Sequence, residues 1–257
     1  MTRLLRGHPV VALLVILALV LVAARTQQGE VEASPGPMPS ASATPPVASV
    51  GDASSTLAGL AVKGRAPRTG YSRDEFGQAW RDLDRNGCDQ RNDVLRRDLV
   101  DVALEDGTHG CVVQSGTLIS PYSGEAVPFL RGTTTSREVQ IDHVVALSDA
   151  WQKGAQAWTP ELREKLANDF LELRATDMST NASKGAGDAA TWLPPRRASW
   201  CAYVAAQIAV KHEYGLWVTA AERDAMAAVL SSCPGQGLPG RSDVPLGAGS
   251  GVAAEQL

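Results

Sequence analysis

Hydrophobic residues recur three or four positions apart in five segments of the chain, which is the spacing of an amphipathic helix. Two of these segments begin with a capping box, Ser72 with Glu75 and Thr219 with Glu222, in which the two residues cap each other's backbone amides. The predicted helices span residues 72–80, 92–102, 160–171, 199–214 and 219–230.

Three other segments have the hydrophobic patterning of strands. They cover residues 111–119, 126–130 and 138–143, and the first two are joined by the turn Pro121-Tyr-Ser-Gly124. Residues 172–187 have little hydrophobic periodicity, so we expect a loop that leads into a short helix. The predicted fold class is α+β, with a small antiparallel sheet and several helices.

The N-terminus has the pattern of an export signal. Arg3 and Arg6 precede an apolar run over residues 10–24, which ends in small residues. We therefore interpret residues 1–25 as a signal peptide or, alternatively, as an uncleaved N-terminal membrane anchor. Either reading predicts a secreted or extracellular membrane-anchored protein.

Composition divides the rest of the chain. Segments dominated by Pro, Ser, Ala and Gly bury too little apolar surface to offset their chain entropy. We therefore expect a disordered linker over 26–68, a folded domain over 69–234 and a disordered tail over 235–257.

The four cysteines agree with export. Cys88, Cys111, Cys201 and Cys233 contain no CxxC pair of the kind that binds zinc, and an even count favours disulfides in an oxidising compartment. Three pairings are open. We favour the local one, Cys88–Cys111 and Cys201–Cys233, because it closes the two shortest loops.

The charge balance gives no global sign of nucleic-acid binding. The formal net charge is −4 and the isoelectric point is near 5.6. A metal ion or a local basic patch could still bind phosphate, and the net charge of the whole chain reveals neither. The arginine candidates for phosphate contacts are Arg91, Arg96, Arg97, Arg131 and Arg137.

An acid directly before a histidine, at the end of an apolar strand, is the centre of the functional case. Asp142 and His143 point to opposite sides of a regular strand, but both reach one site if the strand ends there. The carboxylate would then hold a hard metal ion, and the imidazole would take a proton from water. Phosphodiester hydrolysis needs both actions.

A second segment, Glu172-Leu-Arg-Ala-Thr-Asp-Met-Ser-Thr-Asn-Ala-Ser-Lys184, strengthens the case. Together with residues 139–151 and with Ala167-Asn-Asp and Trp192-Leu-Pro-Pro, it resembles the HNH endonucleases. More narrowly, it is similar to a secreted actinobacterial HNH family related to DUF1524. The resemblance covers nearly all of residues 70–234 and implies a ββα-metal (HNH) motif.

The resemblance also implies residue roles. His143 falls on the general base, Asp142 and Asn181 fall on metal ligands, and Lys184 falls where it could contact a substrate phosphate or remain a solvated helix lysine. The implied cofactor is one divalent ion, Mg²⁺ or Mn²⁺, because two protein ligands leave places for water and phosphate.

One position departs from the family. Glu172 replaces the middle Asn, which fixes the histidine ring. We expect the Glu172 carboxylate to accept that hydrogen bond and make the imidazole more basic. The alternatives are that Glu172 points to solvent and that Asn168 or a backbone carbonyl orients the ring. The departure also leaves open the alternative that this protein has weak nuclease activity or none.

The segment from Asp82 to Asp93 has the spacing of a calcium loop. Asp82, Asp84, Asn86 and Asp93 stand at ligand positions, with Gly87 at the sixth place for the turn. The usual glutamate at the twelfth place is replaced by Asp93. The alternative is an acidic, turn-forming segment after a helix, with no role in metal binding.

These residues predict an exported metal-dependent endonuclease that cuts DNA, and RNA as an alternative, with low sequence specificity. One rival is an extracellular calcium-binding module whose HNH residues are vestigial. The other is a phosphodiesterase for another extracellular phosphodiester. The sequence indicates a nucleic-acid substrate and no stable protein partner.

Overall fold

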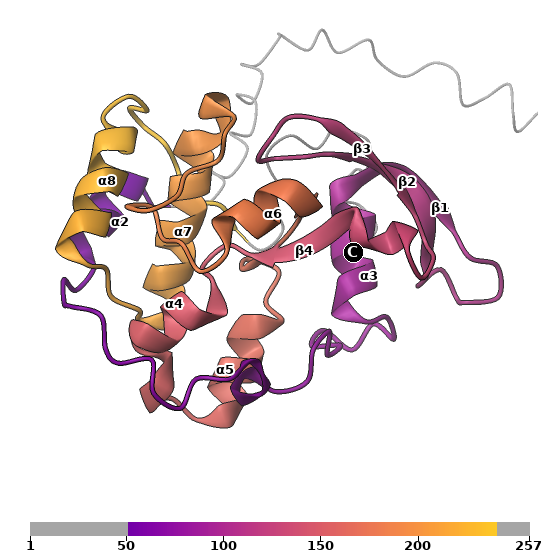
Figure 1. The fold of residues 1–257 in the computed structure, drawn as a ribbon, viewed down its shortest axis with the longest axis horizontal. Coiled ribbons are helices and arrows are strands. Elements are labelled where there is room, and N and C mark those ends of the chain that lie inside the picture. The colour runs from indigo at the N-terminus through magenta and orange to yellow at the C-terminus, as the bar shows by residue number, and fades with distance from the viewer. Residues whose placement is uncertain (1–50, 241–257) are drawn as a thin grey trace, which may run out of the picture. The chain divides into compact units, whose positions relative to one another are not determined.

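The computed structural model describes residues 51–240, and these residues form an α+β fold (Figure 1). The signal peptide or anchor predicted over 1–25, the linker up to residue 50 and the tail from residue 241 lie outside the described residues. The seven described α-helices are α2 (Ala53–Gly59), α3 (Gln90–Asp98), α4 (Leu147–Gln152), α5 (Pro160–Ala167), α6 (Met178–Lys184), α7 (Trp200–Tyr214) and α8 (Ala220–Leu230).

The first sheet has three antiparallel strands in the order β1 (Leu99–Leu104), β2 (Val113–Ile119) and β3 (Ala126–Leu130). The predicted strands over 111–119 and 126–130 are confirmed by β2 and β3. β1 occupies the end of the predicted helix over 92–102, because the chain leaves the helix at Asp98 and pairs Leu99 with Leu118. One face of this sheet shares a buried cluster with α3 and the second sheet.

The second sheet consists of β4 (Val139–His143) and β5 (Leu173–Asp177), which pair antiparallel. β4 confirms the strand predicted over 138–143, whereas β5 occupies residues for which we expected a loop. The short helix α6 follows β5 at once, because the Asp177 carboxylate accepts from the Thr180 amide and caps the helix. In Figure 1, α6 lies beside β4, and the contacts of α6 with both strands agree.

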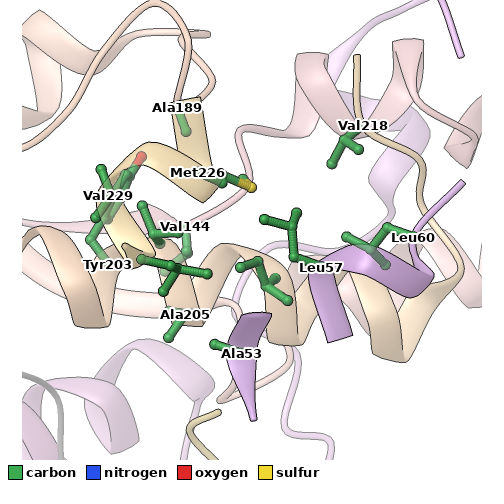
Figure 2. Close-up of a cluster of buried hydrophobic side chains, with 14 of the residues drawn as sticks. Ala53, Leu57, Leu60, Val144, Ala189, Tyr203, Ala205, Val218, Met226 and Val229 are labelled. Atoms are coloured by element: carbon green, nitrogen blue, oxygen red, sulfur yellow. The ribbon is translucent and has the colours of Figure 1, made fainter. Parts of the chain in front are cut away.

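The helices α7 and α8 form the other part of the core. The capping box of Thr219 and Glu222 is present at the start of α8, as predicted. Figure 2 shows Leu57 of α2 and Leu60, the residue after α2, in the same cluster as Met226 and Val229 of α8. This cluster also contains Val144, the residue that follows β4, so it supports the end of that strand.

The folded unit is longer at both ends than the sequence predicted. Residues 51–68 were assigned to the linker, but α2 contacts α7 and α8. The chain after Pro234 also returns to this region, where the Leu238 amide donates to the Gly51 carbonyl over 3.1 Å. Both segments are rich in small residues, and their burial depends on long-range contacts.

The helix predicted over 72–80 is wrong. Only a 3-10 turn, η1 (Arg73–Phe76), forms, and the Ser72 side chain makes no capping hydrogen bond. Gly77 then adopts φ +73°, a conformation open mainly to glycine, and the chain leaves helical geometry there.

The disulfides follow the local pairing that we favoured. Cys88 is joined to Cys111, and Cys201 to Cys233. The first ties the start of α3 to the loop before β2, and the second ties α7 to the residues after α8. Within residues 51–240, no helix is long and apolar enough to cross a bilayer.

Candidate active site

A pocket of about 500 Å³ lies where β4 ends. Asp142 and His143 both line it, and so does Asn181 of α6. The three residues are brought together because β4 ends at His143 and because α6 contacts β4. The sequence predicted this grouping of the two β4 residues with Asn181.

The ring of His143 is held by the end of helix α5. Its Nε2 atom lies 3.0 Å from the carbonyl oxygen of Ala167, the last residue of α5. A carbonyl oxygen can only accept a hydrogen bond, so Nε2 carries the proton and Nδ1 keeps the lone pair. A neutral ring held in this way presents Nδ1 as the proton acceptor.

The charge state of His143 follows from its surroundings. Burial, together with the positive charges of Arg73 and Lys184, lowers the pKa of His143 to about 3, because each disfavours the charged ring. The imidazole is therefore neutral at pH 7, which is the state that a general base requires.

The predicted hydrogen bond between His143 and Glu172 is absent among the described residues. Glu172 is fully buried, and its Oε2 accepts from the Val145 amide at 3.1 Å, while Oε1 has no hydrogen-bond partner within residues 51–240. A backbone carbonyl orients the ring instead, which was one of the alternatives. Burial raises the pKa of Glu172 well above its ordinary value. Glu172 therefore neither holds the ring nor points to solvent.

Asp142 is held by two buried side chains. The Lys184 ammonium donates to Oδ1 at 2.8 Å and to Oδ2 at 2.7 Å, and the Tyr122 hydroxyl donates to Oδ2 at 2.7 Å. The Lys184 side chain is completely buried, and it is not among the residues that line the pocket. The predicted phosphate contact of Lys184 and its alternative as a solvated lysine are therefore both wrong.

Asn181 supplies the other oxygen. Its Nδ2 donates to the Gln140 Oε1 at 2.7 Å, which leaves its own amide oxygen without a hydrogen bond among the described residues. Asp142 and Asn181 thus offer oxygen donors in one pocket, and oxygen donors suit Mg²⁺ or Mn²⁺. Residues 51–240 contain no cluster of three or more His, Cys, Asp or Glu side chains that could hold a metal, so water and substrate would complete the coordination.

The pocket is strongly basic although the chain is acidic. Four arginines line it, and Asp142 is the one carboxylate among its lining residues. They are Arg68, Arg73, Arg91 and Arg137. This local excess of positive charge does not show in the net charge of −4.

The candidate arginines from the sequence divide into two groups. Arg91 and Arg137 line the pocket, whereas the other three donate to backbone carbonyls elsewhere. Arg96 binds Gly110, Arg97 binds Phe170 and Leu173, and Arg131 binds Val113. Sequence reasoning missed Arg68 and Arg73, although the frequent basic residues over 63–73 were a visible signal across the boundary between the predicted linker and the predicted domain.

The candidate calcium loop lies apart from this pocket. The amides of Arg85 and Gly87 donate to Asp82, and the Asn86 side chain donates to Asp84 and Asp93. Burial and nearby carboxylates raise the pKa of Asp93 to about 6. The four residues do come together, but in a loop closed by its own hydrogen bonds, so calcium binding stays a prediction.

Two comparisons place the chain among known proteins. Residues 89–229 match the family model described as the C-terminal domain of GmrSD restriction endonucleases. The chain is 40% identical over 204 residues to a protein of Arthroderma benhamiae named "Uncharacterized secreted protein". That match covers 78% of this chain and 93% of the relative. No solved structure matches the chain.

Proposed function

Because the chain belongs to the family of the C-terminal domain of GmrSD restriction endonucleases, we propose that it is an exported, metal-dependent endonuclease acting on DNA, with RNA as an alternative substrate. The observation that carries this proposal is the neutral imidazole of His143, held through Nε2 by Ala167, in a pocket lined by four arginines. We also infer that β4, β5 and α6 form a ββα-metal motif of the HNH type.

The chemistry begins at His143. Nδ1 takes a proton from a water molecule, whose oxygen attacks phosphorus while the bond to the 3′ oxygen breaks. The departing 3′ oxygen takes a proton from solvent, so the products are a 3′-hydroxyl and a 5′-phosphate. The negative charge of a bound phosphodiester opposes the effect of Arg73 and raises the pKa of His143 towards its ordinary value. The base therefore becomes stronger when substrate is present.

Asp142 and Asn181 are the residues that would hold a divalent ion. When bound, such an ion supplies positive charge against the phosphate and the departing oxygen. Lys184 and Tyr122 fix the direction of the Asp142 carboxylate, so that its position does not depend on the ion. This arrangement supports one ion, Mg²⁺ or Mn²⁺.

Low sequence specificity follows from the same residues. Arginine side chains recognise phosphate, which is common to all nucleotides, and phosphate contacts carry no direct base information. Export is supported by the two disulfides and by the name of the fungal relative.

The test is plasmid and RNA cleavage by the full chain with Mg²⁺, Mn²⁺ or EDTA. We expect cutting with either ion, none with EDTA, and a loss of about 100-fold or more in His143→Ala. His212→Ala is the matched control, because His212 is exposed near the end of α7. Full activity in His143→Ala would contradict the assigned base.

Absence of cutting by the wild type with every ion would reject the nuclease proposal. A panel of small phosphodiesters then separates the two rivals. Hydrolysis of a small phosphodiester favours the alternative phosphodiesterase, and no hydrolysis favours the binding module.

A further inference from the structure

The segment from Arg68 to Arg81 forms one side of the pocket, although it lies before residues 89–229, which match the family model. It contributes two cations and two aromatic rings, namely Arg68, Tyr71, Arg73 and Trp80. The family match therefore assigns no function to this wall of the pocket.

The middle of the segment, residues 75–77, is fixed to helices α4 and α5. The Phe76 ring is buried and packs against Trp151, with 6.4 Å between ring centroids. Arg163 of α5 donates to the Glu75 carbonyl at 2.7 Å and to its carboxylate at 3.1 Å. Gly77 approaches α5 so closely that a Cβ there would lie 2.8 Å from the Glu164 side chain.

The C-terminal end is held in an unusual backbone conformation. Trp80 has φ +60°, which costs energy for a bulky side chain and persists only where contacts impose it. Its carbonyl accepts from the Gln90 amide at 3.2 Å, and the next amide, that of Arg81, donates to Asn168 Oδ1 at 3.0 Å. The Trp80 ring also packs against the cluster under the sheets.

Arg73 is thereby held in place relative to His143. Both residues depend on α5, since Ala167 holds the His143 ring and Arg163 holds the turn that begins with Arg73. Arg73 and His143 line the main pocket together, and they also line a smaller hollow beside it.

The Arg73 guanidinium has no hydrogen bond or ion pair to any described residue, and it is exposed to the pocket. Arg91 differs, because its guanidinium donates to the carbonyls of Ser136 and Val139 at 3.3 and 3.2 Å. A cation on a fixed backbone whose guanidinium has no partner among the described residues can take an anion, and the guanidinium fork fits two oxygens of a phosphate.

We propose that Arg73 binds the phosphodiester on which His143 acts, and that the exposed Arg68 and Arg137 bind adjoining phosphates of the same strand. The proposal rests on the proposed function for the nature of the substrate. Its geometry rests on the pocket and on the attachment of residues 73–81 to α5.

The test measures binding and cleavage separately. Binding of a fluorescein-labelled DNA oligonucleotide to the full chain is followed by anisotropy in EDTA, where we expect no cleavage of the DNA during the measurement. We expect Arg73→Ala to weaken binding about tenfold and to reduce the slope of log K against log salt by about one. Arg73→Lys should restore the salt slope but not the full affinity, because it keeps the charge and loses the fork.

Arg223→Ala is the matched control, since Arg223 is an exposed arginine of α8 paired with its neighbour Asp224. Equal affinity and salt slope in Arg73→Ala and Arg223→Ala would overturn the proposal. So would absence of binding by the wild type. If binding depends on Arg73 but no divalent ion supports cleavage, the subsite stands and the proposed nuclease activity fails.

Discussion

Lys184 donates to both carboxylate oxygens of Asp142, at 2.8 and 2.7 Å, and its side chain has no exposed surface. The same ammonium also donates to the His143 carbonyl. One buried cation at the end of α6 therefore fixes the carboxylate and the backbone of the two residues at the end of β4. Its role is to position the site, and it does not face the pocket.

Lys184→Met should accordingly lower the free energy of unfolding by about 3–5 kcal/mol, because it leaves a buried carboxylate without its cation. Urea denaturation monitored by tryptophan fluorescence measures the change. Lys165→Met is the control, because Lys165 is an exposed lysine of α5. Equal stability of the two variants would show that the ion pair contributes little.

The site could be predicted from the sequence in part. Asp142 and His143 were recognisable from their residue types at the end of a strand, and Asn181 from the resemblance to the HNH endonucleases. The structure places all three in one pocket. The surroundings of Lys184 and Glu172 could not be predicted. Whether such a side chain faces solvent or the core depends on contacts that are distant in sequence, with Asp142 for Lys184 and with Val145 for Glu172.

The fold, like the site, could be predicted from the sequence only in part. β5 was missed because all five of its residues are buried, and this burial depends on partners far along the chain. The Ala175 amide, for example, donates to Asp98 at 2.7 Å. Residues 173–176 alternate between apolar and polar side chains, but the strand has only five residues, so the pattern is short. Helix α2 was missed for a related reason, since only contact with α7 and α8 stabilises such a short helix.

Glu172 should make stability depend on pH. Its folded pKa is raised above the unfolded value near 4.5, so the folded state binds more protons than the unfolded state between these two pKa values. The free energy of unfolding therefore falls as pH rises above about 4.5. Glu172→Gln removes this loss, and we expect the variant to be more stable than the wild type by about 1–2 kcal/mol at pH 8.

The measurement is urea denaturation of both proteins at pH 4, 6 and 8. Comparing the two proteins at each pH cancels the opposite contribution of His143, whose lowered pKa adds stability as pH rises from about 3 to 6.5. Cleavage at pH 7 should remain near the wild-type rate, because Glu172 does not contact His143. A large loss of cleavage with unchanged stability would restore the carboxylate as a relay to the base.

A buried ionic network ties the helices together behind the site. Lys153 is fully buried and lies 2.7 Å from Asp149, 2.8 Å from Asp188 and 2.6 Å from Glu222. Lys153→Met leaves these carboxylates short of positive charge, so we expect a loss of at least about 3 kcal/mol in unfolding free energy. Salt screens buried charges much less than exposed ones. We therefore expect 1 M NaCl to leave the stability difference between Lys153→Met and the wild type nearly unchanged. A variant within about 1 kcal/mol of Lys165→Met would contradict a structural role.

Asp93 in the acidic loop should also make stability depend on pH. The pKa of Asp93 is raised to about 6, so between about pH 4 and pH 6 the folded state holds a proton that the unfolded state has lost. Stability from this group therefore falls as pH rises through that range. Asp93→Asn should be more stable than the wild type by about 1 kcal/mol at pH 7.5 and equal to it below pH 4, as measured by thermal unfolding.

The same two proteins test the calcium loop. Calcium bound by Asp82, Asp84, Asn86 and Asp93 would raise the Tm of the wild type at about 1 mM CaCl₂, since ligand that binds the folded state alone stabilises it. The rise would be absent or smaller in Asp93→Asn. We expect an unchanged Tm, because backbone amides and the Asn86 side chain already bind the carboxylates of Asp82, Asp84 and Asp93. A rise confined to the wild type would instead establish the loop as a calcium site and favour the binding-module rival.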